Sequence, residues 1–422
     1  MGEYQRETLV YNITSKLESL EPLSSPEPYI YKVPDPLRKL NKEAFSPQIL
    51  SIGPFHHGDE KLQNMEKHKL RYLKVLMEQA HKTLEDLLPV IEDLEESVRQ
   101  CYAETISLNR YDFLEMILVD ASFIVVLFYR ISLRGAAKWT NDDKILLKPW
   151  LVATIQRDLM LLENQLPFFI IKKLFDHTLA SQRGLPSFTK LTFNYFKSFN
   201  TQNLPSDPEP SILHFVDLLR RFFLPISHSP LERIDEEVKH VYSATQLDGK
   251  GLKFMADHST ETEHSLLDLD LDYKKGVLKI PHITLNDITE FYARNLIAFE
   301  QCHYPKDARV TDYFILLDFL IKSEKDVDLL GRKGIMVNGL GNNDATFINN
   351  LVTNIAYSDM NTKYYEICIQ LKKFYEDPKH GWLASLRRDY FGNPWKATST
   401  TAVVILLILT LIQAVCSIIS IS

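Results

Sequence analysis

Two apolar stretches of equal length decide the fold class: residues 116–128 read MILVDASFIVVLF and residues 159–171 read LMLLENQLPFFII. Each is interrupted by one acidic side chain, Asp120 in the first and Glu163 in the second. At about 1.5 Å per residue, a helix of either stretch is well short of the roughly 30 Å hydrocarbon core of a bilayer. We therefore expect both to form buried core helices of a mostly α-helical globular body.

Prolines and polar residues set the expected ends of the helices. The helix that begins near Asp59 should end or kink at Pro89, and Pro167 should kink the helix that contains the second apolar stretch. Pro149 fits the first turn of that helix. Ser211 is expected to cap a further helix that begins directly after Ser211. Further helices are predicted from apolar spacing at Asp287–Phe299, Asp312–Lys322, Phe347–Leu351 and Lys363–Tyr375.

The periodicity changes to two between residues 251 and 281. Leu267–Asp272 alternates strictly between leucine and aspartate, and Gly276–Pro281 can return beside it after a turn at Lys274–Gly276. Gly251–Phe254 is also typical of a strand. We expect a small antiparallel sheet here, with leucines facing inward and aspartates outward.

The three aspartates of the alternating stretch raise the hypothesis of a calcium site. In an EF-hand loop that begins at Asp268, the sixth position needs Gly and the twelfth needs Glu, but here they hold Tyr273 and Lys279. A solvated strand face is therefore the favoured interpretation of Asp268, Asp270 and Asp272.

The composition is that of a large globular protein. The chain has 422 residues, of which 45% are hydrophobic and 24% charged, and this excludes a disordered or collagen-like chain. A net charge of -7 gives no indication of nucleic-acid binding. Four cysteines are too few for a disulfide scaffold and fit a reducing compartment.

The C-terminal end differs from the rest of the chain. From Ala397 to Ser422 there is no acidic, basic or histidine side chain. As a helix, residues 398–421 would span about 36 Å, which is enough to cross a bilayer. We therefore predict one transmembrane helix there, with the lipid bilayer as its partner and Trp395 at the interface. A buried core helix is the alternative, and it is disfavoured because such helices seldom run this long without a charge.

The charges around this segment predict its orientation. No charge follows it, and five basic residues precede it, namely Lys372, Lys373, Arg387, Arg388 and Lys396. The positive-inside rule then places the body in the cytoplasm, and the N-terminus is too charged for a signal peptide. The sequence predicts a single-pass, tail-anchored protein with a weakly ordered segment (1–30), a helical body (31–395) and an anchor (398–421).

Two carboxylates are the first candidates for catalysis. Asp158 and Glu163 lie five residues apart among apolar residues, and a pair of carboxylates can do acid–base chemistry. On a helix they would be about 140° apart, so they need not face each other. The favoured alternative is a satisfied polar network of Asp158, Glu163, Asn164 and Gln165, or bonds from them to the backbone freed by Pro167.

Other reactive side chains give weak signals. His56 and His57, with His68 further on, could bind a metal, but they lack zinc-site spacing, and the alternative is that they bond nearby backbone and fix a turn. Cys302 and His303 are neighbours in sequence, which does not make a catalytic dyad, and no GxSxG motif is present. We assign no catalytic, cofactor-binding or metal-binding residue.

Short strings through most of the chain share one family pattern: SIGPFHHG (51–58), MEKHK (65–69), LVDASFI (118–124), DLMLLENQLPFF (158–169), SATQL (243–247), DVDLL (326–330) and NPW (393–395). Together, and in this order, they resemble the plant domain of unknown function 247 family of UPF0481-type membrane proteins. The resemblance implies a plant-specific, mostly helical protein that associates with a membrane through its C-terminus. It implies no established enzymatic activity and no catalytic residue set.

The resemblance also bears on function. Some grass members of the family are associated with pollen-side self-recognition in self-incompatibility, a role that similarity alone does not transfer to this chain. We expect a membrane-anchored protein that presents a surface to a protein partner in recognition or signalling. The alternatives are a membrane-bound enzyme that uses the Asp158/Glu163 region or His56 and His57, and an anchored scaffold without a single partner.

Overall fold

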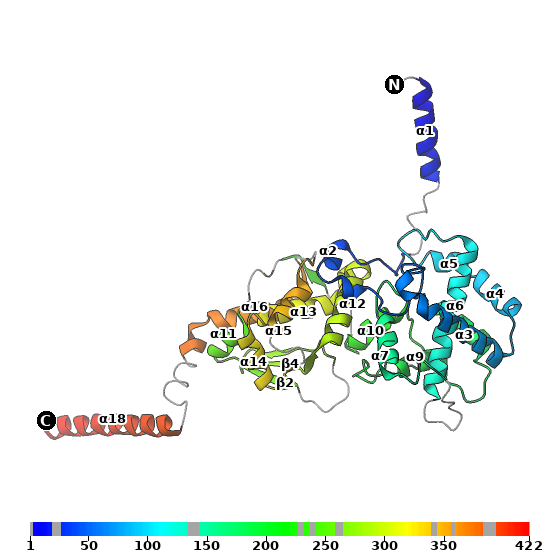
Figure 1. The fold of residues 1–422 in the computed structure, drawn as a ribbon. Coiled ribbons are helices and arrows are strands. Elements are labelled where there is room, and N and C mark those ends of the chain that lie inside the picture. Colours follow the sequence, from blue (N-terminus) through cyan, green and yellow to red (C-terminus); the bar gives the residue numbers. More distant parts are fainter. Residues whose placement is uncertain are drawn as a thin grey trace.

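The computed structural model describes residues 3–18, 27–133, 143–226, 232–236, 238, 241–257, 265–338, 344–355, 359–382 and 394–421. This part of the chain is mostly helical with three small sheets, which confirms the predicted fold class. In Figure 1 the helices form an elongated body, from which α1 (Glu3–Glu18) and α18 (Pro394–Ile421) project at the two ends of the chain.

Helix α6 (Arg110–Ser132) is the centre of the N-terminal half. From Phe113 to Phe128 every side chain except that of Glu115 is buried, because neighbours surround the helix. Asn109 caps α6 by accepting a hydrogen bond from the Asp112 N–H. The neighbours are α3 (Gln63–Ala80), α4 (Leu84–Glu92), α8 (Phe168–Thr178) and α9 (Phe188–Tyr195). The prediction of a buried core helix over residues 116–128 is confirmed.

The second apolar stretch does not form one helix, so the prediction for residues 159–171 is wrong. Helix α7 (Pro149–Asp158) ends before it, residues 159–167 form turns and irregular chain, and α8 begins at Phe168. Pro149 lies in the first turn of α7, as predicted, whereas Pro167 precedes a helix instead of kinking one. A buried turn is stable here because side chains satisfy its backbone groups.

Helix α12 (Asp287–His303) is the centre of the C-terminal half. It packs against α10 (Phe215–Phe223), α13 (Arg309–Leu320) and α15 (Asp344–Val352), and α13 also contacts α16 (Thr362–Glu376). The four helices predicted for this half are confirmed as α12, α13, α15 and α16. The shorter helices are α2 (Asp35–Arg38), α5 (Glu95–Arg99), α11 (Ala244–Gly249), α14 (Glu324–Arg332) and the 3-10 helices η1 (Lys42–Phe45), η2 (Glu60–Leu62) and η3 (Pro305–Asp307).

Two predicted helix ends are wrong. The helix that was expected to reach Pro89 ends at Ala80, because His81 adopts a left-handed conformation with φ of 51°, and Pro89 lies inside the separate helix α4. Helix α10 is capped by His214 and not by Ser211, since the His214 side chain accepts a backbone hydrogen bond from its first turn.

The region predicted to be a small antiparallel sheet is a mixed one. Strands β2 (Lys253–Asp257), β4 (Val277–Pro281) and β3 (Asp270–Asp272) lie in that spatial order. β3 pairs antiparallel with β4, as predicted, but β2 pairs parallel with β4 on its other edge. Leu267 and Leu269 are buried and Asp270 is exposed, in line with the predicted faces.

Two further pairs of strands connect distant segments. β5 (Ile283–Leu285) pairs parallel with β6 (Met336–Asn338), and β1 (Arg233–Ile234) pairs antiparallel with β7 (Met360–Asn361).

Helix α18 is long, apolar and separate from the core. Its segment Thr398–Cys416 has a mean hydropathy of 2.3 and is 0% buried. By length and composition this helix can cross a membrane, and it is the one such helix among the described residues. It begins at Pro394, and Trp395 near its start is exposed. The insertion of α18 in a bilayer and its orientation stay predictions.

Candidate functional site

The predicted acidic residues lie at the buried turn between α7 and α8. Asp158 ends α7, and its carboxylate accepts backbone N–H bonds from Gln48, Ile49 and Leu50, each at 2.9 Å. Burial raises the pKa of Asp158 to about 6, although the three N–H groups oppose the rise. The side chain is completely buried. Asp158 therefore holds the chain after η1 against α7 and is closed to a substrate.

Glu163 contacts a different set of groups. Its Oε1 accepts the Val33 N–H at 2.6 Å and pairs with Arg38, and its Oε2 lies 3.3 Å from His56 Nε2. Since Asp158 and Glu163 bind different segments of the chain, the structure does not bring them together as a catalytic pair.

Asn164 and Gln165 complete a polar network in this turn. Asn164 Oδ1 accepts the Ile52 N–H at 2.7 Å, and its amide donates to Leu50 O at 2.9 Å. Gln165 Oε1 accepts the Phe215 N–H at 2.9 Å, and its amide donates to the carbonyls of Leu159, Leu161 and Asn164. The predicted alternative of a satisfied polar network is confirmed; its partners are backbone groups, except that Glu163 also contacts the side chains of Arg38 and His56.

A second buried cluster joins α3 to α6 beside this turn. Lys69 Nζ donates to Asp120 Oδ1 and, at 2.9 Å, to Ser51 O. The Gly53 N–H donates to Asp120 Oδ2 at 2.8 Å, and Lys69 and Asp120 are both 1% exposed. Burial opposes the ammonium charge, but Asp120 and Glu66 outweigh it and raise the pKa of Lys69. Our sequence reasoning missed Lys69, and the available signal was the single acid within the first apolar stretch.

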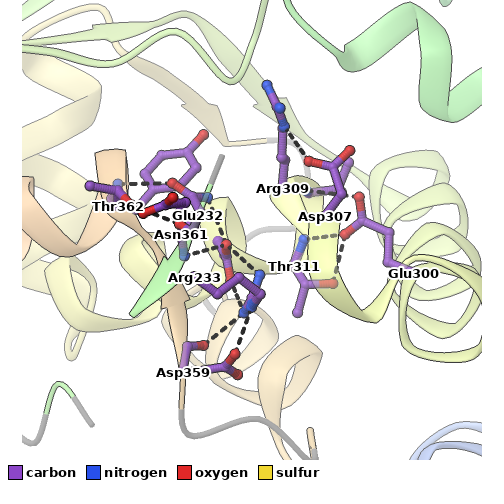
Figure 2. Close-up of polar contacts among 12 residues, drawn as sticks. Glu232, Arg233, Glu300, Asp307, Arg309, Thr311, Asp359, Asn361 and Thr362 are labelled. Carbon is purple, nitrogen blue, oxygen red and sulfur yellow. Dashed lines mark hydrogen bonds and ion pairs between the residues drawn. The ribbon is translucent and has the colours of Figure 1, made fainter. Parts of the chain in front are cut away.

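A third cluster holds the C-terminal half together, and Figure 2 shows it. Glu300 on α12 accepts the backbone N–H and the hydroxyl of Thr311 on α13, both at 2.8 Å. Arg233 on β1 pairs with Asp312 at 3.1 Å and with Asp359 at 2.8 Å. Sequence reasoning missed this cluster, because Arg233 lies 79 residues from Asp312 and 126 residues from Asp359, and no motif or spacing links them.

The histidines that suggested a metal site take separate roles. His56 is largely buried, and burial together with the nearby Arg38 charge lowers its pKa to about 4, so it is neutral at pH 7. His57 is exposed, and His68 Nδ1 lies 3.5 Å from the Arg71 guanidinium. Within the described residues, no group of three or more His, Cys, Asp or Glu side chains could hold a metal ion.

The remaining candidates are also engaged or unreactive. Burial raises the pKa of the Cys302 thiol to about 11, so it is not a nucleophile near pH 7, and His303 Nδ1 lies 3.1 Å from the Tyr31 hydroxyl. The aspartates of the alternating stretch are partly or fully exposed, in line with the predicted solvated face. Each also forms an ion pair with a lysine: Asp268 with Lys363, Asp270 with Lys279 and Asp272 with Lys275.

A surface hollow of about 210 Å³ lies beside the Lys69–Asp120 pair. Met116 and Val119 line it as buried apolar residues, and Glu66, Asp112 and Glu115 add carboxylates that are partly or fully exposed. The Glu66 carboxylate already pairs with Lys69 at 2.7 Å. Apolar side chains beside the carboxylates of Asp112 and Glu115 suit a group that has an apolar stem and a positive head, such as a lysine or arginine side chain.

Comparisons with known proteins agree with this picture. Residues 30–409 match the DUF247 family model, which describes a plant protein of unknown function. The chain belongs to the DUF247 family. It is 30% identical to UPF0481 protein At3g47200 of Arabidopsis thaliana over 431 residues, which cover 93% of this chain and 86% of that protein. It is 24% identical to a second UPF0481 protein of that species, At3g02645, over 406 residues that cover 74% and 75% of the two chains. No solved structure matches the chain significantly.

The strings that resembled the family come together in this DUF247 protein. Lys69 from the second string donates to Ser51 O, and Asp120 from the third accepts the Gly53 N–H, so both hold the first string, residues 51–58. In the other half, Asp326 accepts the N–H and the hydroxyl of Thr245, both at 2.8 Å, which joins the DVDLL and SATQL strings. In both halves, the family strings therefore supply buried polar contacts that hold distant segments of the chain together.

Proposed function

We propose that this DUF247 protein is a membrane-anchored component of recognition or signalling that acts by binding a protein partner. The observation that carries the proposal is α18, whose apolar side chains from Val403 to Val415 are exposed instead of packing on the body. Thirteen Ile, Leu and Val residues lie between Val403 and Ile421. At about 0.3–0.6 kcal/mol each, they favour insertion by about 4–8 kcal/mol.

The basic residues before α18 support an orientation with the body in the cytoplasm. The body then carries the recognition surface, and the acidic hollow beside α3 and α6 is its best candidate. In the alternative of an enzyme that uses the Asp158/Glu163 region or His56 and His57, only His57 is exposed. This alternative loses support because the other three side chains are buried or largely buried and hold backbone or charged neighbours. Alanine at these positions should reduce folding, with no separate loss of turnover.

Alkaline carbonate extraction of plant membranes tests the anchor. The full-length chain should stay in the membrane pellet, and a chain that ends at Asn393 should be released. Protease added to sealed vesicles should digest the body only when the cytoplasmic face is outside. Release of the full-length chain by carbonate would refute the anchor, and protection of the body would refute the orientation alone.

Proximity labelling in plant cells tests the partner. The full-length chain should label a set of membrane-proximal proteins that the chain ending at Asn393 does not. Within that set, the double change Asp112→Lys and Glu115→Lys should remove the partner of the hollow. The matched control, Asp248→Lys and Glu366→Lys, makes the same charge change at exposed positions of α11 and α16 and should keep it. If both double variants label the same partner protein to the same extent, the hollow is excluded as the contact surface.

A further inference from the structure

Helix α18 carries one amide side chain deep in its apolar length. Between Ala402 and Val415, Thr410 and Gln413 are the two residues whose side chains can donate and accept hydrogen bonds. The Thr410 hydroxyl donates to Leu406 O at 2.8 Å within the same helix. The Gln413 amide is exposed and has no hydrogen-bond partner among the residues that the structure describes.

The depth of Gln413 decides what this amide can reach. Along α18 it lies about 12 Å from Ile421 and about 22 Å from Thr398, at about 1.5 Å per residue. Because residues 398–421 are longer than the roughly 30 Å hydrocarbon core, the nearer core boundary lies at least about 7 Å from Gln413 along the helix. The glutamine side chain is shorter than that of lysine or arginine and leans toward the helix N-terminus, so it does not place its amide among the headgroups at the C-terminal side. An amide in hydrocarbon without a hydrogen bond is unfavourable, so an inserted α18 needs a partner for it.

We propose that Gln413 bonds to Gln413 of a second copy, so that α18 makes this protein a dimer in the membrane. A second copy inserted in the same direction brings an identical amide to the same depth. Each NH2 group can then donate to the carbonyl oxygen of the other amide, which satisfies both. The inference rests on the proposed anchoring of α18.

The residues around Gln413 fit a helix pair. Val403, Leu406 and Thr410 precede Gln413 at spacings of three and four, so the four positions form one continuous side of α18. Such a seam is the contact surface of two helices that cross at a small angle, with the amide pair near its end. Because the Thr410 hydroxyl is already bonded to Leu406 O, we expect the hydrogen bonds between the two helices to come from Gln413.

Energy transfer between two fluorescently labelled batches of the full-length chain tests the dimer in phosphatidylcholine vesicles that contain no other protein. Gln413→Leu should weaken association about 5- to 30-fold, which is the range measured for hydrogen bonds between membrane helices in model peptides. Gln413→Asn should keep most of the association because it keeps an amide. Leu411→Ala, two residues away and on another side of the helix, should change it less than about twofold.

Carbonate extraction of the same vesicles separates the two proposals. If the wild type stays in the membrane but shows no energy transfer above the random level, or if Gln413→Leu associates as strongly as the wild type, the dimer is refuted and the anchor stands. If carbonate releases the wild type, both proposals fail. Weakening in Gln413→Leu with retention in Gln413→Asn supports the amide pair, and equal weakening in both refutes it.

Discussion

Replacing Gly53 with alanine should destabilise the body much more than the same change at Gly58. Both glycines lie in the left-handed region, with φ of +75° and +82°, so both alanines incur the same conformational cost of about 1–2 kcal/mol. An added Cβ at Gly58 meets nothing within 4 Å. At Gly53 it would lie 2.4 Å from Gln165 O and 3.2 Å from the Tyr102 hydroxyl.

The extra cost at Gly53 comes from the bonds that must change to relieve this contact. Gln165 O accepts the Tyr102 hydroxyl at 3.0 Å, and the Gly53 N–H donates to Asp120 at 2.8 Å. Moving either backbone segment breaks one of these buried hydrogen bonds, at about 1–3 kcal/mol. Gly53→Ala should therefore cost about 2–5 kcal/mol of the free energy of unfolding, against about 1–2 kcal/mol for Gly58→Ala.

Guanidinium chloride unfolding, followed by circular dichroism on chains that end at Asn393, measures the difference. The two variants should unfold with similar slopes, so that the midpoints report stability directly. Equal losses of stability at the two positions would refute the reasoning, because they would show that the approach of Gly53 to Gln165 is not tight.

Three further predictions concern the buried polar groups. Lys69→Met should lower the free energy of unfolding by about 3–5 kcal/mol, because it leaves the Asp120 charge buried without its ion-pair partner. Adding Asp120→Leu to this variant should recover part of the lost stability. A double variant that is less stable than Lys69→Met would contradict this explanation. His56 has a pKa lowered to about 4 by burial, so the unfolded chain takes up the proton first as the pH falls. This residue should therefore reduce stability between about pH 6.5 and 4, by about 2 kcal/mol at pH 5, and unfolding measured at several pH values should show a shallower loss for His56→Gln. Asp326→Ala should cost about 2–4 kcal/mol in denaturant unfolding, because it removes the acceptor of the Ser323 N–H in the capping box of α14 and the acceptor of Thr245. A loss below about 0.5 kcal/mol would show that these bonds contribute little.

The roles of the acidic residues show where sequence reasoning reached its limit. The sequence predicts that Asp158, Glu163, Asn164 and Gln165 form a satisfied network, because polar groups among apolar residues need partners. It could not identify the partners, and it placed the group on one kinked helix. The network instead stabilises an irregular buried turn, with Asp158 bonded to Gln48 across 110 residues of chain.

The sequence by itself determined the properties that depend on residues close together along the chain. The apolar length of α6, the helical spacing of α12, α13, α15 and α16, and the charge-free stretch of α18 after Lys396 are all local patterns, and the structure has each of them. Only the tertiary structure decided that β2 runs parallel to β4 and that Asp120 pairs with Lys69. These choices depend on contacts between segments separated by tens of residues, and hydrophobic periodicity contains no information about which distant segments meet.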